Sequence, residues 1–215
     1  MNKLLLLLLL FPFCSLGQLH LDSLWSVWGD HDQPDSIRFR AINKIAWDGF
    51  LFSNPDSAFS ISQIYYEEAL TQNNQKEMAN ALNIQGVSCD IRGDFASAIE
   101  LFSKGLKIKE KIGDKKGVSV ALNNIGLIYS AQKEYDLSME YLKKSLSIAE
   151  ETGLPEGVAA SYNNIGSVYM ALEQYDSAKY YFSVGLVKTL NLESKFGISE
   201  AYNNVGHNFS VLSEP

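Results

Sequence analysis

The chain has 215 residues, and 46% of them are hydrophobic, which is enough for a folded core and too many for a disordered chain. Its formal net charge is −7 and its sequence pI is near 5.0. This acidic balance argues against binding to nucleic acid and against docking on an anionic membrane surface, because both attract basic proteins.

The first 17 residues differ in composition from the rest of the chain. Lys3 is followed by an unbroken run of leucines at 4–10, and the small residues Ser15 and Gly17 stand just before the expected cleavage point. A basic start, a short apolar run and a small-residue exit are typical of a secretory signal peptide. The run is too short for a membrane span, which needs about 20 residues. We therefore expect residues 1–17 to be a signal peptide, and the mature chain to be exported across the inner membrane, periplasmic or secreted, without a membrane span.

The two cysteines carry separate expectations. Cys14 leaves lipidation as an alternative to cleavage, although bulky residues precede it where small ones are preferred. Removal of the signal peptide leaves only Cys89, so the mature fold has no internal disulfide. Cys89 shares its repeat position with Tyr129 and Tyr169, and we expect it to be a small buried residue rather than a reactive thiol.

An internal repeat of 40 residues runs through the chain after a leading or cap segment at 18–35. We use the word column for residues that lie 40 positions apart. The clearest columns are Gly86, Gly126, Gly166 and Gly206; Asn83, Asn123, Asn163 and Asn203; Phe95, Tyr135 and Tyr175; Leu106, Leu146 and Leu186; and Gly117, Gly157 and Gly197. They predict an array at 36–212 made of repeats 41–80, 81–120, 121–160 and 161–200 and a half repeat at 201–215.

Each repeat has the pattern of two helices, as at 115–133 and 135–152, where apolar or small residues recur every three or four positions. Gly126 and Ser138 predict a close approach of the two helices, and the glycines of the Gly117 column predict connectors between repeats. One helix pair leaves apolar surface open, so the next pair must cover it. The predicted fold is an all-α solenoid with an inner groove lined by the first helix of each repeat.

The segment Ala-Leu-Asn-Asn-Ile-Gly-Leu-Ile-Tyr at 121–129, followed by Tyr135, Ser138 and Leu142, resembles the tetratricopeptide repeat. That resemblance implies a right-handed superhelix of antiparallel helix pairs that binds a protein or peptide partner and is not an enzyme. The period is 40 rather than about 34 residues, which is similar to a long-repeat variant of peptide-binding scaffold proteins. Segments 42–47 and 54–58 are also similar to exported bacterial repeat proteins, including ectodomains of sensor histidine kinases.

The resemblance places a row of asparagines on the groove or its edge, where amides can pair with the backbone of an extended peptide. In an alternative interpretation, the second asparagine of each pair bonds to the neighbouring repeat and fixes the stacking. The candidate groove residues are Asn83, Asn123, Asn124, Asn163, Asn164, Asn203, Asn204, Leu127, Ser130 and Met170, with Asp90, Ser167, Glu200 and His207 in related positions.

These groove positions are nearly free of Lys and Arg, which the repeat proteins that grip a C-terminal carboxylate use there. We therefore expect no preference for a free acidic C-terminus. A basic streak around the end of the second repeat is interpreted as a solvated outer face. It consists of Lys104, Lys107, Lys109, Lys111, Lys115 and Lys116.

No catalytic motif, cofactor site or metal-ligand cluster emerges from the sequence. Residues 30–32, Asp-His-Asp, are expected to form a solvated turn rather than a metal site. The function expected is a protein–protein interaction scaffold that binds its partner in the inner groove. The alternative is an extracytoplasmic sensor segment of a longer signalling protein, because the helix expected at 194–212 has the pattern of an internal helix. The same open helix leaves a homodimer as a further expectation.

Overall fold

The structure is a computed structural model and describes residues 16–190. The predictions for the half repeat at 201–215, for Asn203 and Asn204, and for most of the signal peptide lie outside these residues. Within them, every regular element is helical, and the predicted all-α solenoid is confirmed. The elements are α1 (Leu16–Gly29), α2 (Asp35–Lys44), the π-helix η1 (Ile45–Phe50), α3 (Pro55–Thr71), α4 (Gln75–Ile91), α5 (Phe95–Lys111), α6 (Lys115–Ala131), α7 (Tyr135–Glu151), α8 (Pro155–Ala171) and α9 (Tyr175–Leu190).

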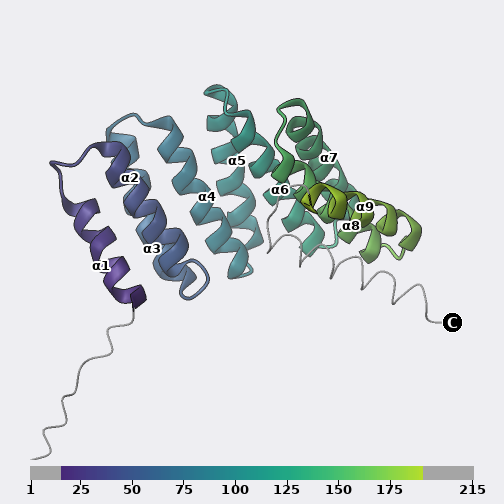
Figure 1. Cartoon of the computed structure of the whole chain (residues 1–215), viewed down its shortest axis with the longest axis horizontal. Helices are drawn as coiled ribbons and strands as arrows, with labels where there is room; N and C mark the ends of the chain where they lie inside the picture. The colour runs from purple at the N-terminus through teal and green to yellow at the C-terminus, as the bar shows by residue number, and fades with distance from the viewer. Residues whose placement is uncertain (1–15, 191–215) are drawn as a thin grey trace, which may run out of the picture.

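The helices follow one another along a curved row, each packed on the helix before it and the helix after it (Figure 1). Helices α4, α6 and α8 are the first helices of three successive pairs, and the segment formed by α2 and η1 takes the same place in the pair before them. α2 contacts α4, α4 contacts α6, and α6 contacts α8. The second helices α3, α5, α7 and α9 make no comparable contact with one another between residues 16 and 190. The first helices therefore form the inner layer of the curve.

Helix starts are set by side-chain caps in the first half of the array. Asn54, Asn74, Asp94 and Asp114 each accept a hydrogen bond from a backbone N–H in the first turn of the next helix. Such caps satisfy donors that have no partner inside the helix. Helix α8 begins instead with Pro155, which loses no hydrogen bond at the first helical position.

The prediction that the Gly117 column marks connectors is wrong. Gly117 and Gly157 lie inside the first turns of α6 and α8, and the N–H of Gly117 donates to the cap residue Asp114 at 2.9 Å. Little space is left beside either glycine. A Cβ on Gly117 would lie 2.8 Å from Cδ of Lys109, and one on Gly157 would lie 3.2 Å from Cβ of Ala149.

The close approach predicted from Gly126 and Ser138 is confirmed. A Cβ on Gly126 would lie 2.8 Å from Cγ of Leu142, and the Ser138 hydroxyl donates to the Gly126 carbonyl at 2.8 Å. Gly86 and Gly166 lie in the same way against the rings of Phe102 and Phe182. The glycines Gly86, Gly126 and Gly166 thus allow α4, α6 and α8 to pack closely on the second helix of their own pair.

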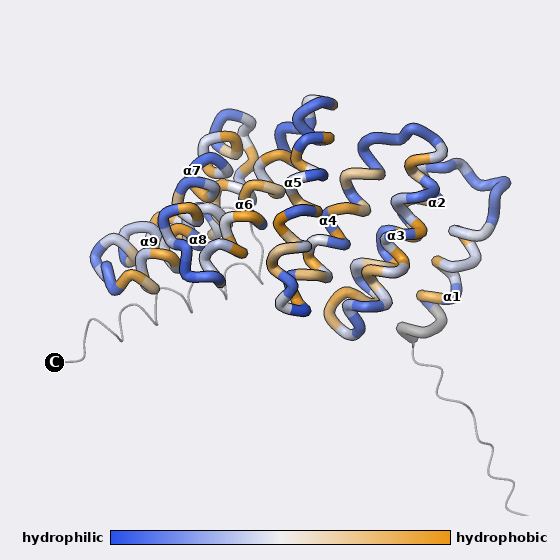
Figure 2. Tube along the Cα trace, turned by 180° about the vertical axis from the view of Figure 1, so that it is seen from behind, coloured by the Kyte–Doolittle hydropathy of each residue, from blue (hydrophilic) through white to orange (hydrophobic). Residues whose placement is uncertain are grey.

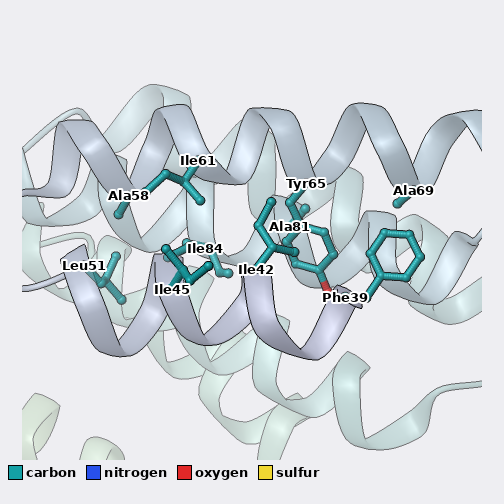
Figure 3. Packing of buried hydrophobic residues seen from close by; sticks show 11 residues of the cluster. Phe39, Ile42, Ile45, Leu51, Ala58, Ile61, Tyr65, Ala69, Ala81 and Ile84 are labelled. Atoms are coloured by element: carbon teal, nitrogen blue, oxygen red, sulfur yellow. The ribbon is translucent and has the colours of Figure 1, made fainter. Parts of the chain in front are cut away.

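The largest core cluster lies at the N-terminal end, where α2, η1, α3 and α4 meet. Phe39, Ile42 and Ile45 point from the α2–η1 segment toward Ile61 and Tyr65 on α3 (Figure 3). α1 covers this cluster through Leu24 and Trp28, which are partly buried against it. Further along the chain, hydrophobic and hydrophilic residues alternate along each helix (Figure 2), as expected for helices that bury one stripe.

Within residues 16–190, no helix is both long and apolar enough to cross a membrane.

Candidate functional site

The asparagine row forms hydrogen bonds between successive first helices. Asn124 on α6 donates its side-chain amide to Oδ1 of Asn83 on α4 at 3.2 Å. Asn164 on α8 donates in the same way to Oδ1 of Asn123 on α6 at 2.8 Å. In both asparagine pairs that the structure describes, the second asparagine therefore bonds to the preceding repeat, as the alternative interpretation has it. Only the remaining amide atoms of these four residues are left for a ligand.

Asn163 stands apart from this pattern. Its Oδ1 is buried and has no hydrogen-bond partner within the described part of the chain. This oxygen lies against Gly185 of α9, where an added Cβ would be only 2.3 Å away. Asn203 and Asn204, the next members of the row, lie outside the described residues.

Four other candidate groove residues, Leu127, Ser130, Ser167 and Met170, also lie on first helices. Leu127 on α6 is 39% exposed, and Ser167 on α8 is exposed. Ser130 and Met170 are half-buried near the ends of the same two helices. These side chains give α6 and α8 a mixed apolar and polar surface.

A hollow with three lysines among its lining residues lies nearer the N-terminus, between α2, η1, α4 and α6, with Lys109 of α5 in its wall. It has a volume of about 360 Å³, and we call it the basic hollow. It includes Asn83 from the asparagine row but not Leu127, Ser130 or Met170. Its lining residues are Asn43, Trp47, Lys76, Asn80, Asn83, Ile84, Lys109, Asp114, Lys116, Gly117 and Val120.

The prediction that the basic streak is solvated is wrong at Lys109. The other five lysines of the streak are exposed, as predicted, and Lys104 and Lys115 form surface ion pairs with glutamates. Lys109 is only 5% exposed, because the end of α5 turns it under the first turn of α6. Burial lowers the pKa of Lys109, and the nearby charge of Asp114 opposes that shift. No hydrogen bond or ion pair to its amine is formed within residues 16–190.

The inner layer therefore carries cations beside the candidate groove positions, which themselves hold no Lys or Arg. Lys76 from the first turn of α4 and Lys116 from the first turn of α6 line the basic hollow together with Lys109. The sequence does contain a signal for Lys109, although the most regular columns do not reveal it. Its column is Ala69, Lys109, Ala149 and Thr189, so a long cation stands where the other repeats have a small residue.

Cys89 is buried, as predicted, and is 1% exposed. Burial raises the pKa of its thiol, and Arg92 donates a hydrogen bond to its sulfur at 3.1 Å. A buried thiol with a raised pKa is a poor nucleophile. Residues 30–33 form a turn, in which Oδ1 of Asp30 accepts a hydrogen bond from the Asp32 N–H at 3.0 Å.

Comparison with known proteins agrees with the fold. Residues 117–186 match the sequence profile described as "Tetratricopeptide repeat". No curated protein matches the chain.

Solved structures of similar fold come from several organisms. BtubC from P. vanneervenii superposes with a TM-score of 0.74 at 19% identity, covering 91% of this chain and 84% of that one. Aspartyl phosphate phosphatase F from Bacillus subtilis gives 0.73 at 15% identity, covering 91% of this chain and 57% of that one. A signal transduction ATPase with a tetratricopeptide repeat sensor, from Pyrococcus horikoshii, gives 0.74 at 16% identity, covering 94% of this chain and 31% of that one. At these identities the likeness concerns the fold alone.

Proposed function

We propose that this protein is a binding scaffold that holds an extended segment of a partner protein against the inner layer of α2, α4, α6 and α8. Solenoids built of such repeats present concave surfaces that bind other proteins. The observation that carries the proposal is the continuity of this layer. Because each first helix contacts the next, their exposed side chains form one surface that crosses several repeats.

The chemistry of this surface suits a peptide of mixed character. Leu127 offers an exposed apolar contact, and the half-buried asparagines offer the amide atoms that the inter-repeat hydrogen bonds leave unused. An extended peptide presents alternating backbone donors and acceptors that such amides can satisfy. The asparagine row then has two roles, stacking the repeats and lining the groove.

Two leucines on opposite layers allow a matched test. Leu127 on α6 and Leu137 on α7 are each 39% exposed, but only Leu127 lies on the inner layer. Peptides selected from a random phage-displayed library with the full mature chain serve as probes. We expect Leu127→Arg to weaken their binding, measured by fluorescence anisotropy, by about tenfold or more, as for a buried interface contact.

Leu137→Arg adds the same charge on the second helix and is expected to leave the affinity unchanged. Circular dichroism verifies that both variants keep the helical fold. If the two variants bind the selected peptides equally well, the inner layer is not the binding surface.

We also propose that the protein acts outside the cytoplasm, on the basis of the signal peptide in the sequence. Intact-mass measurement of the protein from a periplasmic or secreted fraction is expected to show a chain that begins at Gln18. A chain that keeps residue 1 and stays in the cytoplasm contradicts the proposal. A lipid attached at Cys14 would give a mass larger by the acyl groups.

A sensing role in a longer signalling protein would use the same inner layer, so the leucine test applies to both functions. Continuation of the reading frame into a membrane span and an effector would distinguish the sensor from the free scaffold. The homodimer through the helix expected at 194–212 stays a prediction from the sequence, because that segment lies outside the described residues.

A further inference from the structure

The other repeats have no lysine at the position that Lys109 occupies. Its column has Ala69 and Ala149, both 0% exposed, and Thr189, which is 4% exposed and bonds to its own helix. Three of the four repeats therefore fill this place with a small side chain. The remaining repeat, at 81–120, has Lys109 in this place with its side chain largely buried. Burying a cation without a partner destabilises a fold.

The first turn of α6 makes room for this lysine. The stem of Lys109 passes beside Gly117, where any larger residue would collide with Lys109 Cδ or with the Asp114 carboxylate. The lysine is thereby kept under the first turn of α6 and lines the basic hollow instead of extending into solvent. Unpaired buried ionisable groups in a hollow are more typical of binding sites than of cores.

The charges around the hollow add up to an excess of positive charge. Lys76 and Lys116 line it together with Lys109, and Asp114 is the one acidic residue among the lining residues. Asp114 is already engaged, because its Oδ1 accepts the N–H of Gly117 at 2.9 Å and caps α6. This local excess stands out on a protein whose formal net charge is −7.

Amide groups supplement the lysines. The hydrogen bond from Asn124 occupies Oδ1 of Asn83 and leaves its Nδ2 available as a donor beside the hollow. A carboxylate has two oxygens and can accept about four hydrogen bonds, so it can use one or two ammonium groups together with an amide. Phosphate-bearing polymers such as nucleic acid are disfavoured, because the rest of the protein surface is acidic.

The charges of Lys109, Asp114 and Lys116 also have no counterpart in the next repeat. In the next repeat, the residues 40 positions after Lys109, Asp114 and Lys116 are Ala149, Leu154 and Glu156. A partner segment in the groove would therefore meet a basic site over α4 and α6 and none in the matching place over α8. Such a site fixes the register of the bound segment along an otherwise repetitive surface.

We propose that the basic hollow binds the side-chain carboxylate of an aspartate or glutamate in the partner segment, with Lys109 as the innermost cation. This inference rests on the proposed groove binding and specifies the chemistry of one subsite. Lys109 comes from a second helix, so it does not belong to the first-helix positions that were predicted to be nearly free of Lys and Arg.

The test combines peptide and protein changes in one cycle. Peptides selected with the full mature chain are synthesised with an acetylated N-terminus and an amidated C-terminus, and each Glu or Asp is replaced in turn by Gln or Asn. We expect one acidic position whose replacement weakens binding to the wild type by about tenfold or more, as for a charge-assisted hydrogen bond. Lys109→Met is expected to bind the acidic peptide and its Gln-substituted or Asn-substituted version with equal affinity.

Lys107→Met is the matched control, because Lys107 is an exposed lysine of the same helix and its loss changes the net charge equally. It is expected to keep the preference for the acidic peptide. Lys109→Ala provides a second variant, since alanine occupies this column in two other repeats.

The outcomes separate this inference from the proposed function. If the wild type binds peptides through Leu127 but Lys109→Met still prefers the acidic form, the carboxylate site is wrong and groove binding stands. If the peptides bind only with a free C-terminus, or only when phosphorylated, the assignment to a side-chain carboxylate is also wrong. If no peptide depends on Leu127, groove binding itself fails.

Discussion

Lys109 is the residue at which the chain departs most clearly from its own repeat. Its side chain is only 5% exposed beneath the first turn of α6, and Asp114 is close enough to influence its pKa but forms no ion pair with it within residues 16–190. The other charged residues that line the hollow, Lys76 and Lys116, are cationic. Such a residue costs stability, which agrees with selection for binding rather than for packing.

We expect Lys109→Met to raise the free energy of unfolding at pH 7 by roughly 1–4 kcal/mol, the range found when buried ion pairs are replaced by apolar residues of similar volume. The gain should shrink as the pH rises toward the usual lysine value near 10.5. In that range the folded wild type has already lost the proton that the unfolded chain still binds, so wild-type stability rises with pH. Urea denaturation of both proteins at pH 7 and pH 10 measures the difference, and a gain that is constant or grows with pH contradicts the assignment.

Gly126 shows how one missing side chain sets the distance between two helices. An added Cβ would meet Cγ of Leu142 at 2.8 Å and the Leu142 backbone nitrogen at 3.3 Å. The side chain of Leu142 is 0% exposed and has no room to move away. Gly105 in α5 is different, because an added Cβ would meet nothing closer than 3.7 Å.

We therefore expect opposite effects from the same substitution. Gly126→Ala should destabilise the protein, because overpacking costs about 1–3 kcal/mol and exceeds the gain in helix propensity. Gly105→Ala should stabilise it by about 0.5–1 kcal/mol, because alanine is the better helix former and the space is free. Thermal unfolding followed by circular dichroism compares the two, and equal shifts in Tm would show that close packing at Gly126 is not the cause.

At the scale of the elements, the helices from α3 to α9 are joined by connections of one geometry. In each connection the residue before the N-cap has a positive φ. The six residues are Asn73, Gly93, Gly113, Lys133, Gly153 and Glu173, with φ values between 52° and 77°. Glycine and asparagine adopt this left-handed conformation readily, whereas it is unfavourable for Lys133 and Glu173.

Lys133→Gly is expected to stabilise the α6–α7 connection by up to about 1 kcal/mol, since glycine removes the strain of the left-handed conformation. The neighbouring Gln132 has a φ of −80°, so Gln132→Gly should instead destabilise by about 0.5–1 kcal/mol. Both side chains are exposed, so neither change removes a buried contact. Chemical denaturation is the measurement, and a loss of stability in both variants would argue against strain at Lys133.

At the scale of the whole molecule, the array depends on contacts between neighbouring repeats. Buried serines join α6, α7 and α8, with Oγ of Ser145 donating to the Ser119 carbonyl at 2.8 Å and lying 3.4 Å from Oγ of Ser161. The asparagine row adds bonds between first helices on the inner side. Stability of such arrays is approximately a sum of repeat and interface contributions, so each interface bond should be measurable by itself.

We expect Asn83→Ala and Asn124→Ala to be coupled. Either change breaks the same hydrogen bond and leaves the other amide without this partner, so the sum of the two single losses should exceed the loss in the double variant. The coupling energy should be about 0.5–1.5 kcal/mol, the net value of a neutral hydrogen bond. Equilibrium unfolding of the four proteins measures it, and exposed Ser167→Ala is a control expected to have little effect.

The sequence by itself determined the solenoid, the helix pairs and the role of the Gly126 column. These features depend on spacings within one helix or between adjacent helices, which hydrophobic periodicity and repeated small residues record directly. The sequence also placed Cys89 in the core, because its column is otherwise aromatic.

Only the tertiary structure decided the roles of Lys109, Gly117 and the asparagine row. Asn83 meets Asn124, and Asn123 meets Asn164, across 41 residues of chain, and this pairing exists only once two repeats are stacked. Lys109 has the neighbours of a surface lysine in the sequence, and it becomes buried because the tight connection at 112–114 turns α6 back over the end of α5. The rotation of one helix pair on the next sets these contacts, and local periodicity carries no information about that rotation.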